Sequence, residues 1–388
     1  MRISLRHFVH DERGVSLVFV CLGFMAMLSA TTLAIDVGMF MTARSQAQNA
    51  ADAGAHAGAV AFVFNSDTDR TATGPAVKSA MNAALANPVM GAPVSVLSSD
   101  VTFPVDANGV ANRVQVMVHR TALRGNPVDT LMGTFFGVVN VDITATAIAE
   151  ASVANAMTCV KPFMIPDRWI ELNSPANSTY DEFTKQGTVM PDADSYVALR
   201  PYPDPNTDYT GYTTARDAGT RLTLRAGTGD NVNPSFYFSW KMPGDTGGNF
   251  YRDNIAACNQ SVIVRGTPII QEPGDKSGPT VQGIQELVDK DPGAYFEPKP
   301  GCNCVKGSAF AVSPRVFPIP LYDPHLYELG KANGRVADFQ IANFLGFFAE
   351  PPVGNSIPGR ITQIVGLVDK NAAAAPANSF AKAIRLVQ

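Results

Sequence analysis

Few side chains in this 388-residue chain have types and spacing that could do chemistry, and its five histidines are the scarcest of them. A serine or cysteine nucleophile needs a base beside it, and past residue 100 only His119 and His325 could supply one. His325 follows Asp323 in LYDPHLYELG, so a hydrolytic site would be built there. The chain has no H-E-x-x-H, G-x-S-x-G or Walker sequence. We therefore expect no catalytic residue and structural roles for both histidines.

Metal-binding patterns are equally weak. The stretch DPNTDY imitates the start of a calcium loop, with oxygen ligands at Asp204, Asn206 and Asp208. Such a loop needs glycine at its sixth place and glutamate at its twelfth, where this chain has Tyr209 and Ala215. A proline-rich turn is the better interpretation, with a weak calcium site as the alternative, and we expect no metal or other cofactor.

Four of the five cysteines, Cys159, Cys258, Cys302 and Cys304, follow the only long apolar run. If that run crosses the membrane as argued below, all four cysteines lie on the exported side, where an even number indicates two disulfides. Cys302 and Cys304 are too close in sequence for an easy mutual bridge. We therefore expect each to pair with Cys159 or Cys258, which leaves two connectivities open. A four-cysteine zinc site is the alternative, but the spacing lacks two C-x-x-C knuckles.

The apolar run from Val15 to Ile35 predicts a membrane anchor. Its 21 uncharged residues would extend about 31 Å as a helix, enough to cross a bilayer core. A cleaved signal peptide is the alternative, but its apolar region should be shorter. Arg2, Arg6 and Arg13 precede the run and only Arg44 lies close behind it, so the N-terminus is expected in the cytoplasm.

The helical pattern continues beyond the run as far as Phe64, without a proline or another breaker. Small residues recur there in a heptad register that favours close packing against another helix, although alanine also simply favours helix. This predicted packing seam comprises Phe40, Ala43, Ala47, Ala50, Gly54, Ala57, Ala61 and Phe64. At the exit of the span, Asp36 marks the boundary or pairs with a cation on a neighbouring subunit.

Later segments alternate in hydrophobicity like strands. From about residue 156 the composition becomes richer in turn-forming residues, aromatics and cysteines. We expect an α+β protein with four parts: a cytoplasmic tail (1–14), a transmembrane helix (15–36), a long helix laid on a small antiparallel sheet (37–155), and a β-rich disulfide-containing domain (156–388). A short helix is predicted from Pro127 to Phe136. FQIANFLGFFA is too short for a second span and fits a buried strand or helix.

Three stretches together resemble the Tad (tight adherence, Flp-type) pilus-assembly proteins of the TadE/TadG-like group. In the first, Gly14 precedes the span, Asp36 follows it, and NAADAGAHAGA closes the segment. The second joins NRVQVMVHRT to DTLMGTFFGVVNVDITATAIAEA, and the third joins CVKPFMIPDRW to GPTVQGIQELVDKDPGA, which is similar to larger TadG-like members. The resemblance covers roughly the first 155 residues closely and is loose beyond them.

The chain departs from the family pattern at two points. Members cleaved by a prepilin peptidase carry a glutamate five residues after the glycine, where this chain has Phe19. Some large TadG-like proteins contain a von Willebrand A-type module with a D-x-S-x-S metal motif, which is absent from this sequence. The missing glutamate leaves processing of the N-terminus open, and no metal-dependent adhesion site is expected.

The resemblance implies a single-pass inner-membrane protein with most of its chain in the periplasm and a pilin-like first unit. Its role would be structural, in a Tad pilus or secretion apparatus. It would dock against pseudopilins and the inner-membrane platform, or self-associate through the N-terminal helix. The net charge of −4 gives no basic surface for nucleic acid. An anchored periplasmic hydrolase and an envelope glycan-binding module are the alternatives.

Overall fold

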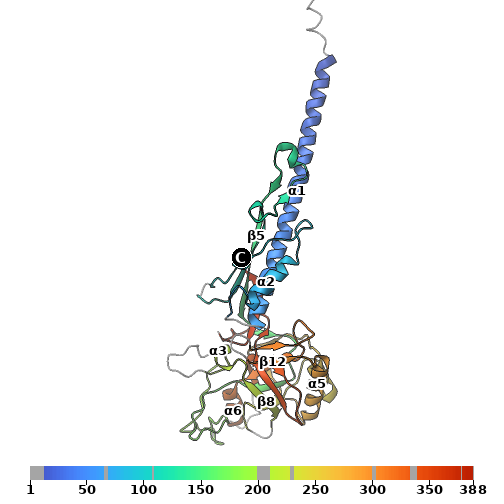
Figure 1. Cartoon of the computed structure of the whole chain (residues 1–388). Helices are drawn as coiled ribbons and strands as arrows, with labels where there is room; N and C mark the ends of the chain where they lie inside the picture. Colours follow the sequence, from blue (N-terminus) through green and yellow to red (C-terminus); the bar gives the residue numbers. More distant parts are fainter. Residues whose placement is uncertain are drawn as a thin grey trace, which may run out of the picture.

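The computed structural model describes residues 13–64, 69–106, 109–198, 210–227, 231–298, 303–332, 339–376 and 378–387. Figure 1 shows one long helix standing out from an elongated unit, which continues into a rounder β-rich body. In these ranges the α-helices are α1 (Arg13–Phe64), α2 (Pro75–Leu85), α3 (Thr214–Asp217), α4 (Gly248–Ala256), α5 (Ser277–Lys290) and α6 (Pro324–Ala332). The 3-10 turns are η2 (Ser98–Asp100), η3 (Ala122–Arg124) and η4 (Gly133–Phe136).

Helix α1 is one unbroken element of 52 residues, which corresponds to about 78 Å. Its sequence contains no proline, and its second half is rich in alanine, so nothing interrupts the hydrogen-bond ladder. The N-terminal part is long and apolar enough to cross a membrane. Its most apolar 18 residues are not buried against any other described part of the chain. Among the described residues it is the one helix that could span a membrane.

The second half of α1 packs on a five-stranded sheet and on α2. The strand order is β1 (Val101–Thr102), β2 (Arg113–Arg120), β5 (Ile143–Val153), β18 (Ala381–Val387) and β17 (Ile364–Val365). Alternate residues of β2 are buried, because successive side chains of a strand point to opposite faces. Val114 and Val116 lie on its buried face and close the core with the small residues of α1 and α2.

A hairpin extends from this unit along α1 towards the span (Figure 1). It consists of β3 (Val128–Asp129), the turn η4 and β4 (Asn140–Val141), with Val128 paired to Val141. The predicted short helix from Pro127 to Phe136 is therefore wrong. Gly133 explains the difference, because a Cβ at that position would lie 2.9 Å from the Val138 carbonyl oxygen. The chain uses this close approach to make a tight 3-10 turn.

The β-rich body is built around a seven-stranded sheet. Its order is β11 (Pro268–Ile269), β15 (Phe339–Ala349), β14 (Val316–Tyr322), β7 (Phe163–Pro166), β9 (Phe236–Ser239), β8 (Arg221–Ala226) and β16 (Ile357–Thr362), and β16 pairs with β15 as well. Two-stranded ladders join β6 (Ala156–Met157) to β10 (Ile263–Val264) and β12 (Tyr295–Glu297) to β13 (Cys304–Lys306). FQIANFLGFFA forms the almost completely buried strand β15, which contributes aromatic side chains to both cores of the body.

The mixed α+β class and the β-rich C-terminal part with a disulfide are confirmed. One element crosses the expected boundary at residue 155, because the last strand, β18, pairs with β5 along Lys382–Val387. The C-terminus accordingly lies beside the sheet of the N-terminal unit (Figure 1). Hydrogen bonding between residues more than 200 positions apart is not encoded in any local pattern, so the sequence could not place this strand.

Candidate functional site

The predicted packing seam on α1 faces the chain's own core. Ala43, Ala47 and Ala50 are fully buried, Ala61 is buried, and Phe40 and Phe64 are half-buried against the same core. Figure 1 shows α2 and the sheet strands alongside this half of α1. The small residues let α2 and the sheet approach closely, as the heptad spacing predicts for a helix neighbour.

Two glycines on α1 show how tight this packing is. A Cβ on Gly54 would lie 3.1 Å from both Ala84 Cβ and Val116 Cγ1, and a Cβ on Gly58 would lie 2.8 Å from Val114 Cγ1. Ala57 is only half-buried, and His56 is exposed on the opposite side of the helix. The seam is therefore occupied within the subunit, and the surface that α1 offers to other molecules is its other face and its span.

Asp36 is buried at the exit of the span, with an exposed fraction of 5%. Its Oδ1 accepts the backbone N–H groups of Leu131 (3.1 Å) and Met132 (3.0 Å). Both donors belong to the hairpin that carries η4, so the carboxylate joins α1 to that hairpin. A charged acceptor that receives backbone N–H groups makes strong hydrogen bonds. Within the chain the partners of Asp36 are therefore these two amides, and its pairing with a cation on a neighbouring subunit stays a prediction.

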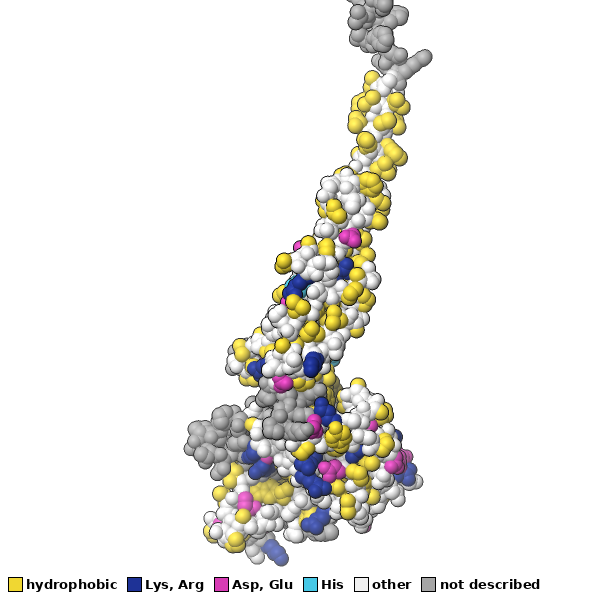
Figure 2. All heavy atoms as spheres, in the orientation of Figure 1, with side chains coloured by type: hydrophobic (Ala, Val, Ile, Leu, Met, Phe, Trp, Pro, Cys, Tyr) yellow, Lys and Arg dark blue, Asp and Glu magenta, His cyan; other side chains and the backbone are white. Residues whose placement is uncertain are grey.

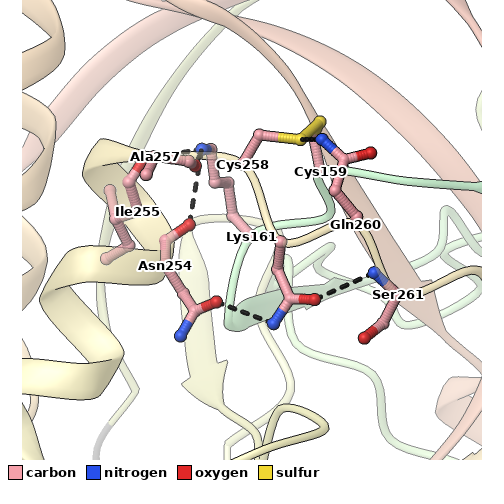
Figure 3. Close-up of a disulfide and its surroundings, with 9 residues drawn as sticks. Cys159, Lys161, Asn254, Ile255, Ala257, Cys258, Gln260 and Ser261 are labelled. Carbon is pink, nitrogen blue, oxygen red and sulfur yellow. Dashed lines mark hydrogen bonds between the residues drawn. A yellow bond between two sulfur atoms is a disulfide. The ribbon is translucent and has the colours of Figure 1, made fainter.

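The disulfide joins Cys159 to Cys258, with 99 positions between them in the sequence (Figure 3). Both expected connectivities are therefore wrong, since each paired one of these two cysteines with Cys302 or Cys304. Cys304 is disulfide-bonded as well, whereas Cys302 lies outside the described residues. Cys21, on the span, is an exposed free thiol.

Beside the disulfide lies a buried lysine that the sequence analysis missed. Lys161 points its ammonium group at the end of α4 (Figure 3) and donates to the carbonyl oxygens of Ile255 and Ala257, the latter at 2.8 Å. These carbonyls have no partner within the helix, so a cation is favourable there. Burial, together with the positive charge of Lys290, lowers the pKa of Lys161 to about 7.

The candidate hydrolytic residues do not form a nucleophile–base pair in the described chain. The Nδ1 of His325 lies 2.7 Å from Glu182 Oε2, and the same carboxylate accepts the hydroxyl of Tyr180. Asp323 instead accepts the backbone N–H of Leu326, which fixes the first turn of α6. Burial raises the pKa of Asp323, and the hydrogen bond from the Leu326 amide and the nearby His325 oppose that rise. The group ties α6 to the loop around residue 182.

A buried carboxylate lies near this group. Asp167 accepts the backbone N–H groups of Arg168 and Tyr212 and the hydroxyl of Tyr196 at 3.0 Å. Burial raises the pKa of Asp167 to about 6, although all three hydrogen bonds lower it. The set joins three loops of the body and was not apparent in the sequence, because its members lie up to 45 positions apart.

The other chemical motifs also resolve into structural contacts or remain undescribed. His119 in β2 lies 3.6 Å from Asp100. Asp204, Asn206 and Asp208 of the calcium-like stretch lie outside the described residues. Within the part of the chain that the structure covers, no three histidine, cysteine or acidic side chains are grouped to hold a metal.

Comparison with known proteins finds a related family for one segment of the chain. No curated protein and no solved structure matches the chain significantly. One family model does match a segment of the chain, which comprises the span, Asp36 and the alanine-rich half of α1 that packs on the sheet. A model of the family described as putative Flp pilus-assembly TadE/G-like matches residues 14–61, which confirms for this segment the resemblance found in the sequence.

Proposed function

We propose that this protein is a membrane-anchored structural component of a Tad pilus or secretion apparatus, a larger TadG-like member that acts by docking. The observation that carries the proposal is the family match over residues 14–61, which coincides with the one described helix able to span a membrane. Pilus-assembly families of this kind act through protein contacts, and the chemistry found at His325 gives an enzyme no support.

The proposed topology places the tail before residue 14 in the cytoplasm and the rest of the chain in the periplasm. The arginines before the span support this orientation, as does the Cys159–Cys258 disulfide, because disulfides persist in oxidising compartments. We further propose that α1 with its sheet acts as a pilin-like unit and that the β-rich body reaches periplasmic partners.

The surface available for docking differs from the predicted seam. Because Ala43, Ala47 and Ala50 are buried inside the subunit, pseudopilins or platform proteins would meet the span and the exposed face of α1. On the span almost every large apolar side chain is exposed, Phe24 among them. Without water at membrane depth, these side chains would pack against other transmembrane helices or against lipid.

The proposal is tested by deleting the gene in a bacterium that assembles a Tad pilus and supplying it again in two forms. We expect the deletion to abolish or sharply reduce pili, and the wild-type copy and a His325→Ala copy to restore them equally. Unchanged piliation in the deletion strain would contradict the assembly role. Failure of His325→Ala alone, with normal protein level, would instead favour the anchored hydrolase.

A photocrosslinker locates the docking surface. Introduced at Phe24, it should capture another component of the apparatus, whereas at the buried Ala50 it should react only within the chain. Mass spectrometry of the crosslinked products, compared between sheared pili and membranes, then shows whether the protein enters the filament.

A further inference from the structure

The hairpin beside the span carries a cluster of exposed apolar side chains. Within residues 130–139, the sequence TLMGTFFGVV contains no charged residue. Its exposed apolar residues, which we call the hairpin patch, are Leu131, Phe135, Phe136, Val138 and Val139. Phe135 is 81% exposed and Phe136 is 64% exposed. A soluble surface rarely places five such side chains together without a partner.

The position of the patch along α1 is fixed by Asp36. This residue follows Ile35, the last residue of the apolar run, and binds the amides of Leu131 and Met132. The turn η4 also contacts α1. Figure 1 shows the hairpin tip beside the part of α1 that projects from the sheet, and Figure 2 shows its apolar surface continuing into that of the span.

The backbone of the hairpin is largely satisfied by its own hydrogen bonds. Val138 N donates to the Gly133 carbonyl at 3.0 Å, and Thr130 N donates to the Val139 carbonyl at 3.0 Å. The Thr130 hydroxyl closes the same turn on the Val138 carbonyl at 2.6 Å. Such closure matters in lipid, because an unpaired backbone group there costs several kcal/mol.

We propose that the hairpin patch inserts into the bilayer interface next to the span, as a second, monotopic membrane contact of the same chain. The occupant of the patch is lipid at the boundary between headgroups and acyl chains, where aromatic side chains are favoured. Continuity with the exposed span and the absence of charge between residues 130 and 139 favour lipid over a protein partner. The inference rests on α1 crossing the membrane and does not depend on the pilus role.

With Asp36 as the link, the hairpin would set the depth and the rotation of α1 in the bilayer. The carboxylate itself stays covered, because the amides of Leu131 and Met132 hold it. This explains how an acid can stand at the membrane boundary without an external cation.

The test uses the full-length protein in phosphatidylcholine vesicles, prepared with or without phosphatidylcholine brominated on its acyl chains. Tryptophan is introduced as Phe136→Trp or, in a second variant, as Phe135→Trp. The native Trp169 and Trp240 are buried in the body and provide a constant background. Ile270→Trp is the matched control, because Ile270 is 72% exposed and directly follows β11 of the β-rich body.

We expect the brominated lipid to remove about half of the added emission for both hairpin variants, because interfacial aromatics lie at the acyl boundary. The Ile270→Trp emission should not change. Unquenched emission from both hairpin tryptophans would overturn the proposal and leave a protein partner as the occupant. Asp36→Ala in the Phe136→Trp background should reduce the quenching, and undiminished quenching would refute the role of Asp36 as the link.

Discussion

At the scale of single residues, two buried charged side chains have backbone groups as their partners. Asp36 accepts two amides of the hairpin, and Lys161 donates to carbonyls at the end of α4. A buried charge without partners would be costly, but hydrogen bonds to the backbone offset part of that cost. Both residues hold together segments about 95 positions apart, so their role is to fix tertiary geometry.

Lys161 predicts a specific dependence of stability on pH. Its pKa is about 7 in the folded chain and 10.5 for an ordinary lysine, so between these values the unfolded state binds more protons. The free energy of unfolding should therefore rise with pH from about 7 to about 10, by up to roughly 1.4 kcal/mol per pH unit. Below pH 7 this contribution is flat, because both states are protonated.

The measurement is guanidinium unfolding in detergent at pH 6.5 and pH 9.5, followed by tryptophan fluorescence. Trp240 reports on this site, because its indole N–H donates to the Lys161 carbonyl at 2.9 Å. Lys161→Met should lose the rise attributed to this group, and Lys185→Met, at an exposed position, should keep it. An equal slope in the wild type and in Lys161→Met would contradict the prediction.

At the scale of elements, the alanine-rich half of α1 serves the subunit's own core. The face marked by the heptad spacing has α2, β2 and β5 of the same chain as its neighbours. Alanine and glycine at these positions bring helix axes and sheet close together. The sequence is limited to small residues at these positions because α2 and the sheet leave no room for larger side chains.

Enlarging one seam residue should destabilise the unit. Ala50 has no exposed surface, so Ala50→Leu overfills the core and should lower the free energy of unfolding by about 1–3 kcal/mol. The neighbouring Asn49 is exposed, and Asn49→Leu should change it by less than about 0.5 kcal/mol. Denaturant unfolding of both variants decides. If Ala50→Leu kept the wild-type stability but the photocrosslinker at Phe24 no longer captured other subunits, the seam would contact partner proteins after all.

At the scale of the whole molecule, the last strand connects the two parts of the chain. β18 pairs with β5 in the N-terminal sheet, and Arg385 contacts Glu150 of that sheet at 3.0 Å. Ala383 belongs to a core of the body, whereas Ile384 packs against the core of the N-terminal unit. Consecutive residues of this strand, which point to opposite faces, thus contact the two different cores.

A charge in this strand should therefore weaken both parts together. Ala383→Asp places a carboxylate at a buried position and should cost about 2 kcal/mol or more. Leu386→Asp, at an exposed position of the same strand, should have little effect. Hydrogen exchange should become faster in β2 and around Trp240 alike for Ala383→Asp. Faster exchange in only one of the two regions would show that the parts unfold independently.

The sequence by itself determined what local periodicity encodes. The apolar run and the absence of proline predicted one continuous helix, alternation predicted strands such as β2 and β5, and the segment around Asp36 carried the family resemblance. Only the tertiary structure decided what each feature meets: the sheet against the seam, the hairpin amides at Asp36, the Cys159–Cys258 bond and the place of β18. These contacts join residues more than 50 positions apart, and packing of the whole chain selects among partners that local sequence leaves equivalent.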